Sequence, residues 1–312
     1  MVVRSLARLS CVAVVAALDS GACARLLPKV AACNVVGTGP WLPFVVGGEA
    51  LGSVRPQDAA ALREHGGGVF DVDDSKICLA ATLEAATPQR RSEAVAEVAE
   101  KLKAAGVVRG WRGELVPVSS AYGAEAAFVV ERACYPLLGC KGYGVHVNGF
   151  VRQEDGSIKL WVARRSFSKP TWPGLLDHLA AGHQPFGISP RENVIKEAGE
   201  EAGVPPDVAA QAKAVGAVSY RGVDEDGRLK NDCLFVYDLE LPEDFEPVVV
   251  DGEVDSFLLC GVDGVLEAIA EDAFKPNCVL VLADFFIRHG ILSPEMPKFL
   301  QLVASLRQGD CA

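Results

Sequence analysis

Positive charge is scarce in this sequence, and the shortage limits what the protein can bind. The 312 residues contain 30 Lys and Arg against 41 Asp and Glu, which gives a formal net charge of −11. Proteins that bind nucleic-acid polymers normally carry a basic excess that neutralises phosphates. The charge balance therefore argues against a nucleic-acid-binding protein. A small anionic substrate could approach only where the negative charge is locally neutralised.

Long apolar runs and paired cysteines are also missing. No stretch approaches the roughly 20 apolar residues that span a bilayer, so we expect a soluble protein with no membrane partner. The ten cysteines are scattered and form no C-x-x-C pair, which argues against a zinc ribbon or a thioredoxin motif. Free thiols of a reducing compartment are expected instead of disulfides. Half of the residues are hydrophobic, which excludes a disordered chain.

Residues 1–25 have the composition of a leader segment. They contain Arg4 and Arg8, an apolar stretch over residues 11–18 and a single acid, Asp19. Three interpretations stay open: an organelle transit peptide, a signal peptide that ends near residues 22–24, and an ordinary first helix or disordered leader. A transit peptide is favoured over a signal peptide. The expected location is the cytoplasm, or a plastid or mitochondrion if the segment is a transit peptide.

The length favours two domains. Residues 26–140 mix short β-rich runs with two helical patterns, one that ends at Gly66 and one for which Ser92 is a candidate N-cap. They predict a small α+β N-terminal domain. Residues 141–296 begin with a predicted hairpin around Asp155 and end with a helical pattern.

Strands and helices alternate along this second segment in a mixed order. The order predicts an α/β domain in which helices sandwich a mixed sheet. Residues 297–312 are expected to form a C-terminal helix or tail.

One helix of the second domain has strong boundary signals. Ser189 is placed as an N-cap, Pro190 fits the first helical position, and Glu192 completes a capping box. Gly203 is a natural C-terminal stop. The sequence therefore predicts a helix between Ser189 and Gly203.

Three carboxylates lie on one side of that helix. Glu197, Glu200 and Glu201 fall within an arc of roughly 100°, because successive residues are about 100° apart. Like charges at this spacing repel each other. Hard divalent cations such as Mg²⁺ or Mn²⁺ would neutralise them, since oxygen ligands suit those ions. The alternative is a solvent-exposed face of the helix, on which Lys196 reduces the repulsion among the three acids.

The glycine loop and this helix together resemble the Nudix box, G-x5-E-x7-R-E-U-x-E-E-x-G-U, in which U is aliphatic. The matching positions are Gly182, Glu197, Glu200, Glu201, Gly203 and Val204. Two positions depart from the pattern. Ile188 stands in place of the first glutamate, and Lys196 replaces the arginine, keeping its charge without its planar fork.

The resemblance extends over roughly residues 26–294. Blocks such as YGVHVNGFVR, KPTWPGLLDHLAAG and FKPNCVLVLADFFIRHG are similar to eukaryotic Nudix proteins related to the Nudix portion of thiamin pyrophosphokinase fusions. It implies a Nudix α/β/α sandwich behind a small N-terminal domain, and a Mg²⁺- or Mn²⁺-dependent hydrolase. No kinase activity is expected, because the kinase part is absent.

The resemblance also implies roles for residues of the box. Glu197 and Glu201 would be metal ligands, with Glu201 central to catalysis and Glu200 sharing a second ion. The backbone carbonyl of Ala181 would add a ligand, and Gly182 would let the loop approach the phosphates.

Residues outside the box are candidates for the remaining roles. Glu253 is the candidate general base, in an E-V-x-x-F pattern, with Asp251 and Glu246 as competitors. Arg164, Arg165 and Lys169 are candidate phosphate contacts. Trp172 is a candidate for stacking on a heteroaromatic ring, and a packing role is its alternative.

The implied reaction is hydrolysis of a diphosphate linkage in a small phosphorylated substrate. For this subgroup the resemblance suggests thiamin diphosphate analogues or oxidised nucleoside diphosphates such as 8-oxo-dGDP. One alternative is a catalytically degenerate Nudix fold that binds a ligand or partner. An isomerase on the same fold would need a cysteine in or near the box, and the sequence has none there. The oligomeric state does not follow from the sequence.

Overall fold

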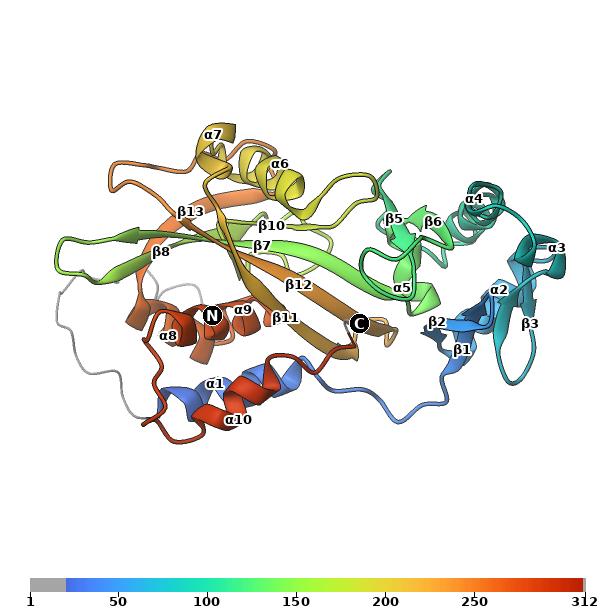
Figure 1. The fold of residues 1–312 in the computed structure, drawn as a ribbon, viewed down its shortest axis with the longest axis horizontal. Coiled ribbons are helices and arrows are strands. Elements are labelled where there is room, and N and C mark those ends of the chain that lie inside the picture. Colours follow the sequence, from blue (N-terminus) through green and yellow to red (C-terminus); the bar gives the residue numbers. More distant parts are fainter. Residues whose placement is uncertain (1–20, 311–312) are drawn as a thin grey trace.

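A computed structural model describes residues 21–310, and its first sheet lies in a small α+β domain (Figure 1). Four strands form this sheet in the order β2-β1-β4-β3, and β5 pairs with β6 apart from it. The elements are β1 (Leu42–Val46), β2 (Glu49–Val54), α2 (Pro56–His65), β3 (Phe70–Val72), β4 (Ile77–Leu79), α3 (Ala81–Glu84), α4 (Pro88–Ala104), β5 (Leu115–Val118), β6 (Phe128–Glu131), a 3-10 turn (Arg132–Cys134) and α5 (Tyr135–Leu138).

Helix α4 begins earlier than its expected cap. Thr87 is the N-cap and Pro88 occupies the first helical position, which proline favours because it has no N–H to leave unpaired. Ser92 lies inside the helix, where its Oγ donates to the Pro88 carbonyl at 2.7 Å and accepts from the Val129 N–H at 2.9 Å. The expectation for Ser92 was wrong, and this side chain joins α4 to β6 instead.

A larger mixed sheet forms the second domain. Its main path is β11-β12-β7-β8-β13, and β10 and β9 pair with β7 and β8. The β12–β7 pair is parallel and the other pairs are antiparallel. The strands are β7 (Lys141–Arg152), β8 (Ile158–Arg165), β9 (Leu176–Asp177), β10 (Ala180–His183), β11 (Lys213–Val223), β12 (Leu229–Glu240) and β13 (Val254–Gly261).

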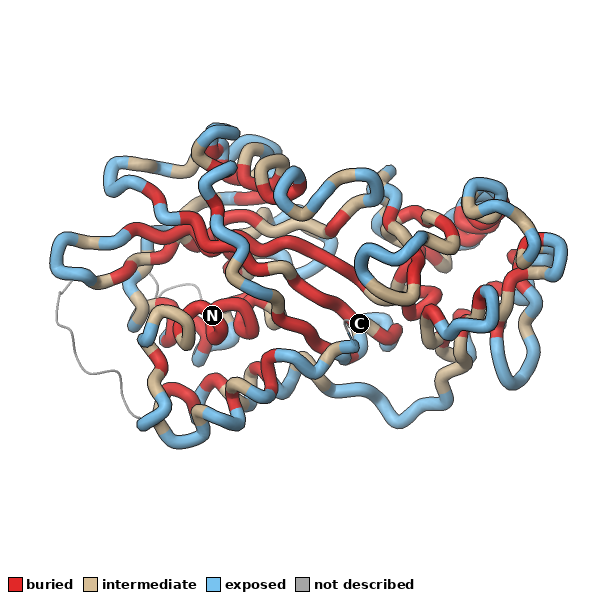
Figure 2. The backbone as a smooth tube through the Cα atoms, in the orientation of Figure 1, coloured by how far each residue is buried: buried red, intermediate tan, exposed pale blue. Residues whose placement is uncertain are grey.

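Helices cover both faces of this sheet (Figure 1). One face carries α6 (Pro190–Ala202) and α7 (Pro206–Ala209). The other carries α8 (Val262–Ala270), α9 (Pro276–Arg288), α10 (Phe299–Ser305) and α1 (Ala22–Ala32). Figure 2 shows burial concentrated in the central strands and in the inner sides of these helices. The predicted sandwich of helices around a mixed sheet, preceded by a small α+β domain, is confirmed.

Helix α1 comes before the small domain in sequence but packs against the second one. Ala22, Cys23, Leu26 and Val30 are buried in the same apolar cluster as α8, α9 and α10. Most of the predicted leader, residues 1–25, lies outside the described residues, and its last four residues form the start of α1. The placing of domain boundaries along the chain stays a prediction.

Two absences hold for residues 21–310. No helix there is long and apolar enough to cross a membrane. Apart from Cys233, the cysteines of that range are free thiols, and the expectation of a reducing compartment stays a prediction.

Asp238 on β12 fastens helix α9 to the sheet. Its carboxylate accepts hydrogen bonds from Arg288, from the His289 ring at 2.9 Å and from Asn148 at 3.0 Å. Burial alone would raise the pKa of Asp238, but the bonds from His289, Arg288 and Asn148 lower it to about 2. The contribution of this carboxylate to stability is therefore present above pH 4 and is lost as the pH falls towards 2.

We expect Asp238→Asn to lower the free energy of unfolding at pH 7 by about 1–2 kcal/mol, since the pKa shift is worth that much after allowance for partial exposure. Urea titrations at pH 7 and pH 3 measure it. The difference from the wild type should shrink at the lower pH, because the Asp238 carboxyl of the unfolded chain, with an ordinary pKa of about 3.9, is then largely protonated. The exposed Asp244→Asn is the control and should change neither value. An equal difference at both pH values would contradict the assigned pKa.

Candidate active site

Helix α6 is fixed at both ends by the residues that the sequence indicated. The Ser189 hydroxyl accepts from the Glu192 N–H at 3.2 Å, and the Glu192 carboxylate accepts from the Ser189 N–H at 2.7 Å. Pro190 is the first helical residue, and Gly203 ends the helix with a φ of 62°, a left-handed conformation that glycine adopts without strain. The predicted capping box is confirmed, and the helix presents its acids in a defined direction.

The three acids of α6 lie in different surroundings. Glu197 is 8% exposed, while the side chain of Glu200 is 54% exposed. Glu201 accepts a hydrogen bond at 2.9 Å from the backbone N–H of Ala181 on β10. Burial raises the pKa of Glu197, and burial together with repulsion from Glu197 raises the pKa of Glu201 well above its usual value. Two of the acids therefore face the β10 loop at an electrostatic cost.

Gly182 makes that arrangement possible. A methyl group on Gly182 would lie 2.1 Å from Cδ and 2.3 Å from Oε1 of Glu197, so the Glu197 side chain would have to move away. The absence of a side chain at Gly182 thus lets the Glu197 carboxylate rest against the loop backbone. The geometry gives the box glycine a concrete function in this chain.

Lys196 occupies the position between two of the acids. Its Nζ lies 2.9 Å from Oε1 of Glu197 and 3.0 Å from Oε2 of Glu200. Burial would lower the pKa of Lys196, but these two carboxylates raise it above its ordinary value. The lysine that replaces the arginine of the box therefore still pairs with carboxylates of the same helix. Ile188 supplies no carboxylate, and only its carbonyl is engaged, by Gln184 at 2.7 Å.

The donor set fits a hard divalent cation. All the side-chain donors of the box are carboxylate oxygens, as Mg²⁺ and Mn²⁺ require. Glu197 and Glu201 are acids whose raised pKa values a bound cation would lower again. The glycine cradle leaves space at the loop for the Glu197 carboxylate. These observations support the metal roles of Glu197, Glu200, Glu201 and Ala181, which stay predictions.

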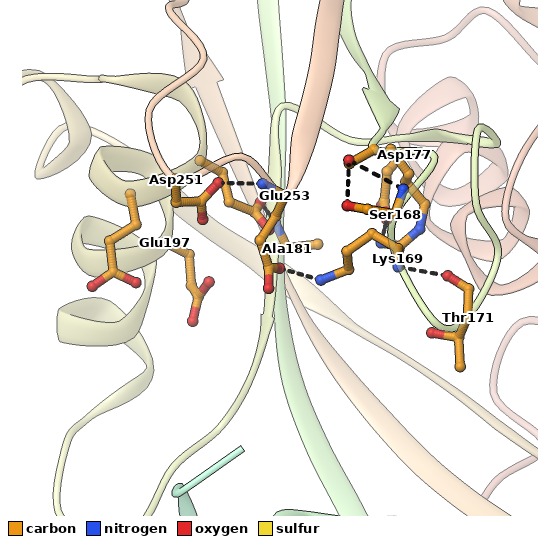
Figure 3. Close-up of polar contacts among 12 residues, drawn as sticks. Ser168, Lys169, Thr171, Asp177, Ala181, Glu197, Asp251 and Glu253 are labelled. Atoms are coloured by element: carbon orange, nitrogen blue, oxygen red, sulfur yellow. Dashed lines mark hydrogen bonds and ion pairs between the residues drawn. The ribbon is translucent and has the colours of Figure 1, made fainter. Parts of the chain in front are cut away.

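Glu253 lies across from the box helix. Figure 3 shows it between Glu197 on α6 and Lys169, which reaches it from the loop after β8. Burial would raise the pKa of Glu253, but the ion pair with Lys169 lowers it below its ordinary value. The Asp251 carboxylate accepts from the Glu253 N–H at 2.8 Å and so supports the backbone there. Of the competitors for the role of base, Glu246 is exposed on the preceding loop.

The arginines of β8 hold the loop that carries Lys169. Arg165 donates to the carbonyls of Thr171 and Trp172 at 3.0 and 3.1 Å, and its remaining nitrogen lies 2.9 Å from the Asp177 carboxylate. Arg164 donates to the Gly174 carbonyl at 2.9 Å. Both guanidinium groups thus bind the protein itself, and their contact with phosphate stays a prediction.

Trp172 lies at the edge of a different space. Trp172 lines a cavity of about 230 Å³ together with Lys29 of α1, Ile269 of α8 and Val279 of α9. These helices cover the face of the sheet opposite α6. These contacts do not favour a stacking role for Trp172 over a packing role. Stacking on a substrate ring stays a prediction.

The small domain contributes residues to the site that sequence reasoning did not single out. The Phe186 N–H donates to the Leu115 carbonyl at 2.8 Å, which joins the box loop to β5. The ring of His183, next to Gly182, lies 4.8 Å from the ring of Tyr135. Burial raises the pKa of Glu253 and Lys169 lowers it, and two cations of the small domain, Arg112 and Arg132, lower it further by smaller amounts. Arg112 lies in the segment RGWRGELVPV and Arg132 in FVVERACYPLLG, and the similarity of these segments to the resembled family was their only signal in the sequence.

Comparisons with known proteins agree with this geometry. A domain of unknown function, DUF4743, matches residues 25–142, and the NUDIX domain matches residues 142–278. Nudix hydrolase 24, chloroplastic, of Arabidopsis thaliana is 42% identical over 289 residues, which are 92% of this chain and 78% of that protein. Nudix hydrolase 20, chloroplastic, of the same plant is 44% identical over 283 residues, 88% of this chain and 75% of its own length.

A more distant likeness concerns the second domain. An isopentenyl-diphosphate Delta-isomerase of Leifsonia xyli subsp. xyli is 30% identical over 138 residues, 44% of this chain and 74% of that protein. No cysteine lies in the box, residues 182–204, and Cys278 donates to the Asp177 carboxylate at 3.0 Å, a few residues before the box. Burial raises the pKa of Cys278 well above its usual value, so it is a thiol and a weak nucleophile.

Proposed function

This chain belongs to the Nudix hydrolase family, and from that premise we propose that it hydrolyses a diphosphate linkage in a small phosphorylated substrate with Mg²⁺ or Mn²⁺. The observation that carries the proposal is a pair of acids held against the β10 loop. Glu197 is buried and rests against the backbone of Gly182, and Glu201 is half-buried and accepts a hydrogen bond from the Ala181 N–H. Holding two carboxylates close together and partly away from water costs free energy that a cation would offset.

Each residue near the loop has a defined part in this proposal. Glu197 and Glu201 would hold the metal, with Glu200 available from the solvent side. The bound metal would supply charge neutralisation at phosphorus and a water of lowered pKa. Glu253 would accept the proton of the attacking water, and Lys169 keeps Glu253 in its ionised form.

Cations near the site would allow an anionic substrate to approach this acidic protein. Lys169, Arg112 and Arg132 all lie close enough to Glu253 to lower its pKa. A diphosphate that enters beside Glu253 would therefore meet positive charge from both domains. The negative charge of the chain as a whole would then matter little, since salt screens charges beyond about 8–10 Å.

The candidate substrates are thiamin diphosphate analogues and oxidised nucleoside diphosphates such as 8-oxo-dGDP. The first rests on the resemblance to the Nudix portion of thiamin pyrophosphokinase fusions, and neither follows from the contacts of the site. Because the two relatives of Arabidopsis are named chloroplastic, we propose that residues 1–20 include part of a plastid transit peptide.

A substrate panel tests the proposal. Thiamin diphosphate, its oxidised forms, 8-oxo-dGDP, dGDP and ADP-ribose are incubated with Mg²⁺ and with Mn²⁺, and phosphate-containing products are measured by chromatography. Metal-dependent turnover of one class, absent in Glu201→Gln, is the expected result. Tight binding of a ligand without turnover would instead support the degenerate binding module. Isopentenyl diphosphate is included, and its isomerisation would overturn the proposal.

Lys169→Met tests the role of Glu253. Without the ammonium group the pKa of Glu253 should rise, so the acidic limb of the kcat/KM profile should move to higher pH. The profile is measured from pH 4 to pH 9 with the substrate found in the panel. Lys213→Met, on the exposed edge of β11, is the control and should leave the profile in place. An unchanged acidic limb in Lys169→Met would remove Glu253 from the role of general base.

A further inference from the structure

Four side chains with metal-binding atoms meet on the face of the sheet opposite the box helix. His146 on β7 alternates with Val145 and Val147, whose side chains pack under α6, so the imidazole points towards α9. Asp177 ends β9 and His178 follows it, while Cys278 lies in the first turns of α9. All four are buried, with exposures of 3%, 6%, 4% and 0% for His146, Asp177, His178 and Cys278.

The candidate ligand atoms lie close enough together for one ion, and the two shortest pairs are at hydrogen-bond distance and would move apart when the ion binds. The Nδ1 atoms of His146 and His178 are 2.8 Å apart, and Sγ of Cys278 lies 3.0 Å from Oδ1 of Asp177. Nδ1 of His178 is 3.7 Å from the same Oδ1, and one ligand atom from each residue lies within 4.8 Å of all the others. A tetrahedral zinc ion with bonds of about 2.0–2.3 Å has ligand–ligand edges of about 3.3–3.8 Å.

The chemistry of the donors also selects an ion. Two imidazoles, a thiol and a carboxylate form a borderline-soft set that suits Zn²⁺, whereas the box offers only hard oxygen atoms. Among residues 21–310, this cluster is the one group of three or more such side chains whose ligand atoms lie this close together. The two potential metal positions of the chain therefore differ in donor type.

The residues around the cluster act as a supporting shell. Arg165 and Lys275 contact Oδ2 of Asp177 at 2.9 and 3.4 Å, which leaves Oδ1 facing the cluster. Such contacts orient a ligand carboxylate in metal sites. Arg165 and Lys275 would repel an isolated Zn²⁺ ion. Zn²⁺ bound to the Cys278 thiolate and the Asp177 carboxylate carries no net charge, so this repulsion is removed.

We propose that His146, Asp177, His178 and Cys278 form a structural Zn²⁺ site, separate from the box and not dependent on the proposed hydrolase function. Four protein ligands leave no open position, which is typical of structural zinc. Binding would form a Zn–S bond and release the proton of the Cys278 thiol to solvent. The ion would tie α9 to β7 and to the segment just before Ala181, the strand on which the box helix rests.

The unmodified protein provides the decisive experiment. The chain is purified without chelator, its metal content is measured by mass spectrometry, and the metal is then exchanged for Co²⁺. We expect about one zinc ion per chain. The cobalt form should show a thiolate-to-cobalt charge-transfer band in the near ultraviolet and the intense visible bands of tetrahedral cobalt. Absence of tetrahedral cobalt spectra from the folded wild-type protein would overturn the proposal.

Variants then assign the ligands. Cys278→Ser should abolish the charge-transfer band, whereas Cys134→Ser, at a thiol equally buried in the small domain, should keep it. Glu201→Gln should also keep it, because the box is a separate site. A charge-transfer band that survives in Cys278→Ser would contradict the assignment. If Cys278→Ser does not fold, the wild-type spectrum still decides, and His146→Asn replaces it with loss of the tetrahedral visible bands as its readout.

Discussion

Replacing Glu201 by glutamine is expected to reduce kcat by about 10³-fold or more, a loss of about 4 kcal/mol of transition-state stabilisation. The side chain can keep its hydrogen bond, because the glutamine carbonyl accepts from the Ala181 N–H as the carboxylate does. What is lost is a negative charge beside Glu197. The measurement is kcat with saturating Mg²⁺ and the substrate identified in the panel.

The same substitution should act in the opposite direction on stability. In chelator at neutral pH, Glu201→Gln should unfold at a higher temperature than the wild type, because burial and Glu197 make the ionised carboxylate costly. Glu200→Gln is the matched comparison on the same helix, and its exposed carboxylate predicts a smaller change in both quantities. A Glu201→Gln protein that is as active as the wild type would exclude this side chain from catalysis.

Gly182→Ala is expected to have the second largest effect, a loss of at least 10²-fold in activity. The added methyl group would overlap the Glu197 carboxylate, so this side chain must leave the loop. Displacing a catalytic or binding group by about 1 Å can cost about 10²-fold in rate. Activity and the Mg²⁺ concentration for half-maximal rate are measured together, and the second should rise because a ligand has moved.

Gly199→Ala provides a control on the box helix itself. A methyl group at Gly199 would meet only the Val204 carbonyl at 3.8 Å, an ordinary contact. Because glycine inside a helix is less favourable than alanine, this variant should be more stable by about 0.5–1 kcal/mol with kcat unchanged. Equal losses of activity in both variants would mean that any methyl group added to the box damages the site, and the specific contact of Gly182 with Glu197 would be refuted.

The parts of the site that could be predicted are those encoded locally. The capping box of Ser189 and Glu192 and the stop at Gly203 are governed by residues three or four positions apart, so the sequence was enough to place α6. The spacing of the acids predicted that they share one side. It could not predict that Glu197 would be buried and Glu200 exposed, because burial depends on where β10 passes.

The remaining features depend on contacts between distant segments. The bond between Phe186 and Leu115 joins residues 71 positions apart, and no local pattern encodes it. The same is true of Cys278, which the scattered cysteine positions did not single out and which the fold brings 3.0 Å from Asp177. Sequence patterns therefore predicted elements and motifs, while the neighbours of each side chain had to come from the tertiary structure.

Helix α1 has a consequence for how the chain is made. It is synthesised before the small domain, yet it lies beside α9 and α10 (Figure 1), and its buried side chains belong to the same apolar cluster as those of α8, α9 and α10. At about 5–20 residues per second, α1 would wait roughly 15–50 s before α10 is synthesised. The small domain can complete its sheet during that time. We therefore expect the apolar side of α1 to stay exposed on the nascent chain, as a target for chaperones until α8, α9 and α10 have been synthesised.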